Sequence, residues 1–192
     1  MERGEGDVDD RQLVVLAQKG QAEAFEALME RYKRKAYRTA FDFTRDREEA
    51  KDLSQDAFLR AFANLKRFDM RASFQTWFYR ILVNVCLDHR RRKARVYWQP
   101  LEDSSGREDV RAEIADPHPR PDQKAQEAEL LRRVGAALDS LPAKQRAAFL
   151  LKNHQGFTIA EIAEVMQMAP GTVKVHIHRA VTSLRQCLGE LI

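Results

Sequence analysis

An apolar pattern with the period of an α-helix recurs in three successive stretches, and it constrains the fold of this chain more than any other feature. The stretches begin near Phe25, Ala50 and Phe74, and their apolar residues are spaced by three and four positions. Sequence signals for β-strands are nearly absent. We therefore predict an all-α protein in which the three stretches pack into one core, with Leu53 and Phe62 on the apolar side of the second.

The segment from 141 to 191 is predicted to form a helix-turn-helix. Thr158 and Glu161 have the S/T-x-x-E spacing of a capping box, which places a helix start at Thr158. Pro170 suits the first turn of the following helix, and Gly171 is expected to allow a tight turn there. The outward side of that helix would carry the residues able to reach a DNA major groove: Thr172, Lys174, Val175, His176, His178 and Arg179. This agreement of cap, turn and basic face favours a DNA-binding domain over an ordinary surface helix.

The helical period stops between the two halves of the chain. From Glu102 to Glu129 there are nine acidic and four basic residues, and prolines and serines are frequent. Such a segment cannot build a core of its own. We therefore predict two small helical domains, 1–96 and 126–192, joined by a flexible acidic linker over 97–125.

The first domain ends in a basic block. From Lys66 to Arg95 there are nine basic residues against two acids, and a block of this density suits a polyanion such as nucleic acid. Within the block Arg80 and Asn84 would lie near Arg91 on the exposed side of a helix, with Arg90 and Arg92 close by. Basic residues beside an asparagine could hold backbone phosphates and an unstacked base.

No catalytic or metal-binding pattern stands out. Cys86 and Cys187 are far apart and outside any C-x-x-C pair, so both are interpreted as small buried hydrophobic residues. Motifs of metalloproteases, P-loop proteins and serine hydrolases are absent from the sequence. We expect a protein without cofactor, metal or enzymatic activity. An acidic N-terminus and the lack of a long apolar run predict a cytoplasmic protein with no membrane span.

Four segments in order together resemble the extracytoplasmic-function sigma factors, which are small two-domain sigma subunits of bacterial RNA polymerase. The segments read AFEALMERY, DREEAKDLSQDAFLRAF, FQTWFYRILVNVCLDHRRR, and LPAKQRAAFLL followed by TIAEIAEVM and GTVKVHIHRA. The resemblance covers nearly the whole chain. It implies a region 2 domain that binds core polymerase and opens the −10 promoter element. It also implies a region 4 domain that binds the −35 element and the flap of the β subunit.

The resemblance also implies roles for single residues. Asp52 and Gln55, with their neighbours Leu53, Asp56 and Phe58, would form the surface that binds the clamp coiled coil of the β′ subunit. Asn84 would help to capture a flipped non-template base, in a pocket shaped by the loop of Asp69, Met70, Arg71 and Ala72. The −35 contacts would lie on the helix that starts at Gly171 and Thr172. Val175 and His176 depart from the family's frequent serine and arginine, which changes the expected −35 preference.

Two further partners follow from the resemblance. An anti-sigma factor is expected to pack against both domains. The acidic linker is expected to enter the polymerase channel that later holds RNA, where carboxylates can imitate phosphates. A plain solvated spacer is the alternative for the linker.

Two other functions are weighed against a sigma factor. A helix-turn-helix regulator would bind a palindromic site without polymerase, but it leaves the basic segment and the Asp52 helix without a role. A nuclease would need clustered carboxylates or a His-based acid/base pair. His154, His176 and His178 lie in or near the predicted helix-turn-helix, and the sequence pattern shows no acidic partners for them.

Overall fold

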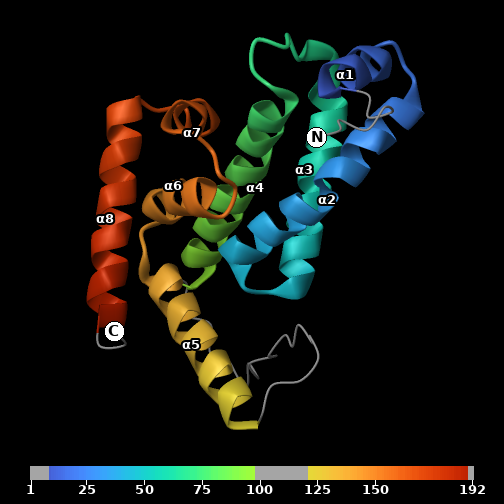
Figure 1. Cartoon of the computed structure of the whole chain (residues 1–192). Coiled ribbons are helices and arrows are strands. Elements are labelled where there is room, and N and C mark those ends of the chain that lie inside the picture. The colour runs from blue at the N-terminus through green and yellow to red at the C-terminus, as the bar shows by residue number, and fades with distance from the viewer. Residues whose placement is uncertain (1–8, 98–120, 190–192) are drawn as a thin grey trace, which may run out of the picture.

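The computed structural model describes residues 9–97 and 121–189, and every regular element within these ranges is a helix (Figure 1). In chain order the elements are α1 (Asp10–Gln18), α2 (Ala22–Thr44), α3 (Arg47–Asn64), the short 3-10 helix η1 (Leu65–Arg67), α4 (Phe74–Tyr97), α5 (Pro121–Ser140), α6 (Ala143–Asn153), α7 (Ile159–Met166) and α8 (Pro170–Leu188). The predicted all-α fold is confirmed. Most of the predicted acidic linker, 98–120, lies outside the described residues, and α5 begins within the remainder.

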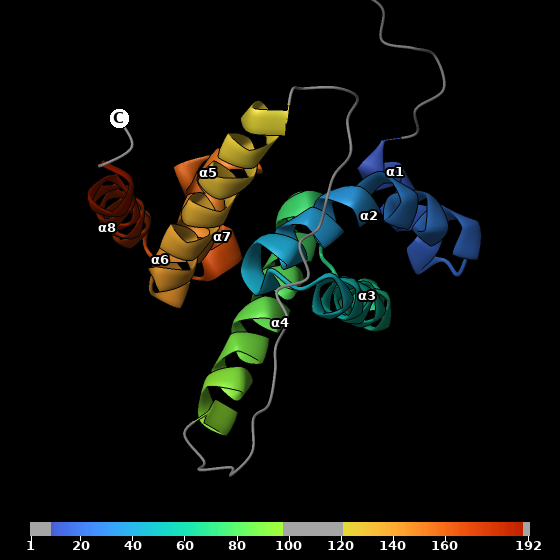
Figure 2. The same cartoon turned by 90° about the horizontal axis from the view of Figure 1, so that it is seen from below.

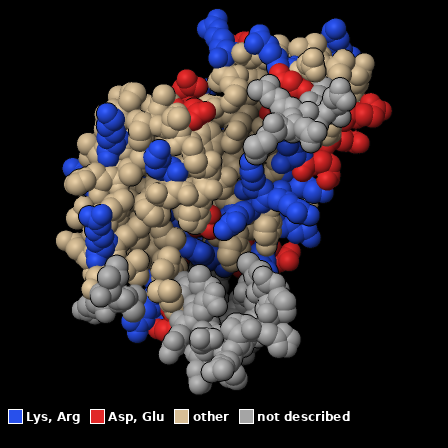
Figure 3. Space-filling model, in the orientation of Figure 1, with Lys and Arg blue, Asp and Glu red and all other residues tan. Residues whose placement is uncertain are grey.

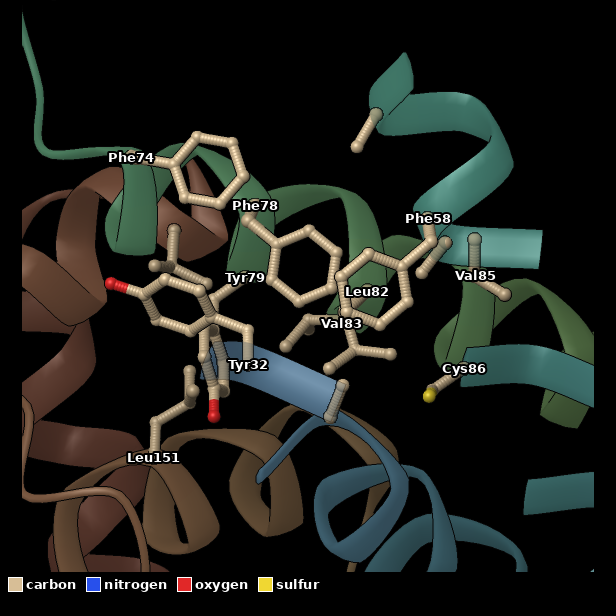
Figure 4. Close-up of a cluster of buried hydrophobic side chains, with 14 of the residues drawn as sticks. Tyr32, Phe58, Phe74, Phe78, Tyr79, Leu82, Val83, Val85, Cys86 and Leu151 are labelled. Atoms are coloured by element: carbon tan, nitrogen blue, oxygen red, sulfur yellow. The ribbon is translucent and has the colours of Figure 1, made fainter. Parts of the chain in front are cut away.

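The N-terminal unit consists of α1 to α4, and aromatic side chains fill its core (Figure 4). Phe78 of α4 is fully buried and stacks on Phe58 of α3 with a centroid separation of 4.5 Å. Tyr32 of α2 approaches the same ring from the other side, at 6.1 Å. Leu53 is buried as predicted, whereas Phe62 is 59% exposed and only leans on Phe25. The placement of Phe62 in the core was therefore wrong, because its ring touches Phe25 at the edge of α2 and remains mostly in solvent.

The C-terminal unit contains the predicted helix-turn-helix, formed by α7 and α8. Thr158 accepts a hydrogen bond from the Glu161 amide, and the Glu161 carboxylate accepts one from the Thr158 amide, so the capping box is confirmed. Pro170 occupies the first turn of α8, also as predicted. The left-handed residue of the turn is Gln167, with φ of 52°, and not Gly171, which already belongs to α8. A Cβ at Gly171 would meet no atom within 4 Å, so glycine is not required there.

The two units pack directly against each other. Figures 1 and 2 show α6 and α7 lying between α8 and α4. The main cluster of buried hydrophobic residues continues from one unit into the other and joins Tyr79 of α4 to Phe157, which precedes α7, with ring centroids 4.9 Å apart. We call the whole contact between the two units, from α2 and α4 on one side to α5, α6 and α7 on the other, the seam.

Burial separates the two cysteines. Cys86 is buried, and burial raises the pKa of its thiol to about 12, although nearby Arg146 opposes the shift. Cys187 is exposed on the last turn of α8, so its predicted burial was wrong. In the described part of the chain no helix is both long and apolar enough to cross a bilayer.

Candidate nucleic-acid interface

α8 presents most of its predicted DNA contacts to solvent. Val173 and Ala180 are fully buried and hold the helix against the rest of the unit. The exposed side carries Thr172, Lys174, Val175, His178 and Arg179. Exposed lysine and arginine can bind phosphates or guanine, and the 46% exposed Val175 offers an apolar surface that fits a thymine methyl group. This side of α8 thus combines polar and apolar side chains that are able to contact base edges.

His176 differs from the other predicted contacts. Its side chain is half-buried, and its Nδ1 atom is buried without a hydrogen-bond partner within residues 9–97 and 121–189. Burial lowers the pKa of His176, and the positive charges of Lys144 and Arg179 add to this. His176 is therefore neutral at pH 7 and presents less of its ring to DNA than the sequence pattern indicated.

α4 carries the second predicted nucleic-acid surface. Asn84 is exposed, and Arg91 and Arg92 are exposed on the following turns. Arg80 and Arg90 lie at the seam instead: the Arg80 Nε atom donates to the Glu164 carbonyl at 3.1 Å, and Arg90 donates to the Asp139 carbonyl at 3.4 Å. In the docked structure only part of the predicted −10 set is free. Lys and Arg side chains gather over the α2–α4 half of the face drawn in Figure 3 and are more scattered over the α6–α8 half.

The loop between η1 and α4 lines a cavity of about 350 Å³. Met70 adopts a left-handed conformation with φ of 56°. Asp69 accepts a hydrogen bond from the Arg71 amide at 3.1 Å and forms an ion pair with the Arg71 guanidinium at 3.1 Å. The other wall comes from α1 and the residue before it. The full lining is Asp9, Asp10, Arg11, Val14, Phe68, Met70, Arg71, Ala72, Ser73 and Phe74. Asn84 is not among these residues, since it lies ten positions after Phe74, or about 15 Å along the helix.

α3 exposes a stripe that the sequence pattern revealed only in part. Asp52 and Gln55 are exposed and Asp56 is half-buried, whereas Leu53 and Phe58 are only 6% and 8% exposed. Leu53 and Phe58 therefore belong to the core beneath this surface and are not part of the exposed side. The exposed side continues instead to Leu59, 69% exposed, and Phe62. Positions 52, 55, 59 and 62 recur at three and four residues, so they form one stripe, which we call the α3 stripe.

The α3 stripe is held in place by contacts between α3 and α4. Asp46 caps the start of α3 by accepting from the Glu49 amide. Glu49 then binds Lys93 at 2.6 Å and His89 at 3.0 Å on α4. Burial alone would raise the pKa of Glu49, but these two partners outweigh it and lower the pKa below the ordinary value. The carboxylate therefore stays charged and ties the two helices together.

The seam is polar as well as apolar. Tyr79 donates to Gln155 at 2.8 Å, and the Asp42 carboxylate contacts His154 at 2.8 Å. Arg146 of α6 is 1% exposed; it pairs with Asp139 and donates to the Asp42 carbonyl. Burial lowers the pKa of Arg146, and neighbouring Arg90 and Arg45 add to this while Asp139 opposes it.

Three buried donor nitrogens at the seam have no partner among the described residues: Nε of Arg45, a terminal nitrogen of Arg90, and Nε of Arg146. A buried donor without a partner costs about 1–3 kcal/mol. These three nitrogens offset part of the stabilisation that the apolar contacts and hydrogen bonds of the seam provide.

The described residues contain no group of three or more His, Cys, Asp or Glu side chains placed to hold a metal ion. The features that the geometry does bring together are two separated basic helix faces, a cavity beside a short loop, and a partly apolar stripe on α3.

Comparison with known families matches both units. The Sigma-70 region 2 family matches residues 28–96, and the Sigma-70, region 4 family matches residues 131–184. The ECF RNA polymerase sigma factor SigW of Bacillus subtilis is 33% identical over 175 residues, covering 90% of this chain and 93% of that protein. SigM of Mycobacterium tuberculosis is 35% identical over 188 residues, covering 98% and 89%.

Two solved structures share the fold. CnrH, determined in complex with the cytosolic domain of CnrY, superposes with a TM-score of 0.70 at 25% identity, covering 94% of this chain and 97% of that one. RpoE of Bartonella quintana, determined with the anti-sigma factor NepR, has a TM-score of 0.69 at 24% identity, covering 88% and 98%.

Proposed function

Because the chain belongs to the extracytoplasmic-function group of sigma-70 factors, it is a sigma subunit that directs transcription initiation, and we propose that separate surfaces bind polymerase and each promoter element. The domain division into 1–96, 97–125 and 126–192 is part of this proposal. So is the absence of a chemical step: the protein acts by binding alone. The observation that carries the proposal is that three different helices expose three different surfaces. α3 exposes a stripe that is partly apolar, α4 exposes an asparagine with arginines, and α8 exposes basic residues around a valine.

The α3 stripe is the proposed contact for the clamp coiled coil of the polymerase β′ subunit. Asp52 and Gln55 supply polar groups, and the exposed Leu59 and Phe62 supply the apolar area that a stable contact needs. Large exposed apolar side chains next to one another on a helix are uncommon without a partner. Asp56 lies beside the stripe and contributes charge.

Replacing both Asp52→Ala and Gln55→Ala should weaken binding to core polymerase by roughly ten- to a hundredfold, the range expected when interface residues each contribute over about 1 kcal/mol. Leu59→Asp should act similarly, because it places a charge in an apolar contact. Glu23→Ala, an exposed acid on α2, is the control and should leave binding unchanged. The measurement is a titration of labelled core polymerase; wild-type affinity in both stripe variants would contradict the clamp assignment.

The loop cavity is the proposed pocket for an unstacked −10 base. Its walls combine charged groups with Phe68, Met70 and Phe74, which suits a base held by stacking and by hydrogen bonds to its edge. Asn84 and the exposed arginines of α4 then contact the same strand farther along. Melting needs only that these contacts offset the unstacking of a base, which costs a few kcal/mol.

α8 is the proposed −35 reader, and Arg179→Ala is its test. If Arg179 binds a guanine edge, its loss should weaken −35 binding by on the order of 1–3 kcal/mol, and only for sequences with that guanine. Arg185, exposed farther along α8, gives the matched control Arg185→Ala. Binding is measured with systematically mutated −35 duplexes. A small loss that is equal for all sequences would show a phosphate contact in place of base reading.

The docked structure must open for both elements to be bound. Elements centred about 25 base pairs apart are about 85 Å apart on straight duplex at roughly 3.4 Å per step. The seam holds α4 and α7 in direct contact, with Arg80 bonded to Glu164. We therefore propose that region 2 and region 4 separate on polymerase, and that hydration of the unpaired arginine nitrogens of the seam favours this separation.

Two partner proposals remain. The resemblance of the whole docked chain to CnrH, which was solved with CnrY, supports an anti-sigma partner that binds the closed form. The acidic composition of 97–125 supports its passage through the RNA channel of the polymerase. Neutralising Glu102, Asp103, Glu108 and Asp109 should then change the yield of abortive transcripts, and unchanged initiation and promoter escape would contradict this path.

A further inference from the structure

A groove between α3 and the final turns of α4 is lined almost entirely by arginine side chains. Its volume is about 270 Å³, and its lining residues are Arg60 of α3 and Asp88, Arg91, Arg92 and Arg95 of α4. Four arginines and one aspartate give this lining a formal charge of +3. The groove holds no large apolar side chain, in contrast to the neighbouring α3 stripe.

Internal ion pairs leave much of this charge available. Arg60 binds Asp56 one turn earlier on α3, with N–O distances of 3.0 and 2.9 Å, and Arg91 binds Asp88 at 2.6 Å. Both pairs are substantially exposed, so water and salt screen them and either arginine can exchange its partner. Arg92 and Arg95 have no ion-pair or hydrogen-bond partner within 9–97 and 121–189.

The groove continues the proposed nucleic-acid side of α4. Positions 84, 88, 91 and 95 recur at three and four residues and therefore share one side of the helix. From Asn84 to Arg95 this side extends about 16 Å at roughly 1.5 Å per residue. A strand held at Asn84 and running along α4 toward its C-terminal end would reach the groove.

We propose that this groove binds a backbone phosphate of promoter DNA, with Arg60 of α3 and Arg95 of α4 as additional phosphate ligands beside Arg91 and Arg92. The inference rests on the proposed function and adds a residue from α3, the helix that also carries the proposed clamp contact. A guanidinium fork matches the oxygens of a phosphate, and several such forks around one groove favour a phosphodiester over a protein side chain.

The test compares Arg60→Gln and Arg95→Gln with wild type in holoenzyme assembled from core polymerase and the full chain. Arg47→Gln is the matched control, because Arg47 is exposed on the same helix but outside the groove lining. Affinity for a promoter fragment is measured at several salt concentrations. Each groove variant should bind several-fold more weakly, and the slope of log K against log salt should shrink by about 0.9 for a duplex phosphate or about 0.7 for a single-stranded one. The control should keep the wild-type slope.

The other outcomes distinguish a DNA phosphate from a small anion, and failure of the groove proposal from failure of the proposed function. Wild-type slopes in both groove variants would overturn the inference while leaving the proposed function intact. Weaker assembly with core polymerase at an unchanged DNA slope would assign the groove to a protein contact and would also overturn it. If inorganic phosphate binds the free chain in an Arg60-dependent manner but the DNA slope is unchanged, the site takes a small anion and not DNA. A wild-type holoenzyme that binds no promoter would overturn the proposed function itself and the inference with it.

Discussion

Cross-linking region 2 to region 4 across the seam should reduce promoter-specific initiation to background while leaving the chain folded. Arg80 and Glu164 are in contact, so cysteines introduced by Arg80→Cys and Glu164→Cys can be joined by a short bis-maleimide that contains a cleavable disulfide. The exposed Cys187 is replaced by serine, and the buried Cys86 is protected from reagent. The locked chain cannot bind both elements, because they lie farther apart than its two docked reading surfaces. Run-off transcription with core polymerase measures the effect.

Two controls make the result specific. The same double-cysteine chain without reagent must remain active, since Arg80 itself belongs to the proposed −10 set. Adding a reducing agent after cross-linking must restore initiation. Full activity of the locked chain, with cross-linking complete on a gel, would contradict the opening of the seam.

Replacing Phe78→Ala should lower the free energy of unfolding of the N-terminal unit by about 3–5 kcal/mol, the usual cost of removing a buried aromatic ring. Phe78 is fully buried and contacts Phe58, Phe74 and Tyr32 at centroid separations of 4.5, 6.0 and 6.1 Å. Because small domains are stable by only about 5–15 kcal/mol, this change removes much of the stability. Urea unfolding is followed by the fluorescence of Trp77, which stacks on Phe68 at 4.6 Å, in a chain whose other tryptophan is replaced by Trp98→Phe.

Phe62→Ala is the matched control for Phe78→Ala. The same atoms are removed, but Phe62 is 59% exposed and its main contact is the ring of Phe25 at 5.0 Å. Its loss should cost less than about 1.5 kcal/mol. Similar costs for the two variants would show that Phe62 is part of the core and would remove the apolar end of the α3 stripe.

The features that could be predicted from the sequence are those set by neighbouring residues. The capping box at Thr158 and the proline at the start of α8 depend on contacts within one helical turn, and both are confirmed. Helical periodicity likewise predicted the all-α fold. Periodicity did not show which side of a long helix remains uncovered. Phe62 was therefore placed in the core, although its spacing from Asp52 and Leu59 could have indicated a shared exposed side.

The seam could not be predicted, because it joins residues remote in sequence. Arg146 meets the carbonyl of Asp42 across 104 positions, and nothing local to Arg146 distinguishes it from an exposed arginine. The α1 wall of the loop cavity could not be predicted for the same reason. Asp10 and Arg11 lie far from Met70 and Arg71 in the sequence, and only the packing of α1 brings them together. Neighbouring residues in the sequence predict where helices begin and end and which side of α8 is exposed. Sites formed between helices can be located only in the packed structure.

The most direct test of the central claim is transcription in vitro from a pool of genomic promoter fragments by bacterial core polymerase, with and without this protein. We expect defined start sites that appear only when the protein is added. Alignment of the active fragments should yield two separated elements, near −35 and −10. A failure to produce any new start site, together with a failure of the protein to co-purify with core polymerase, would contradict it.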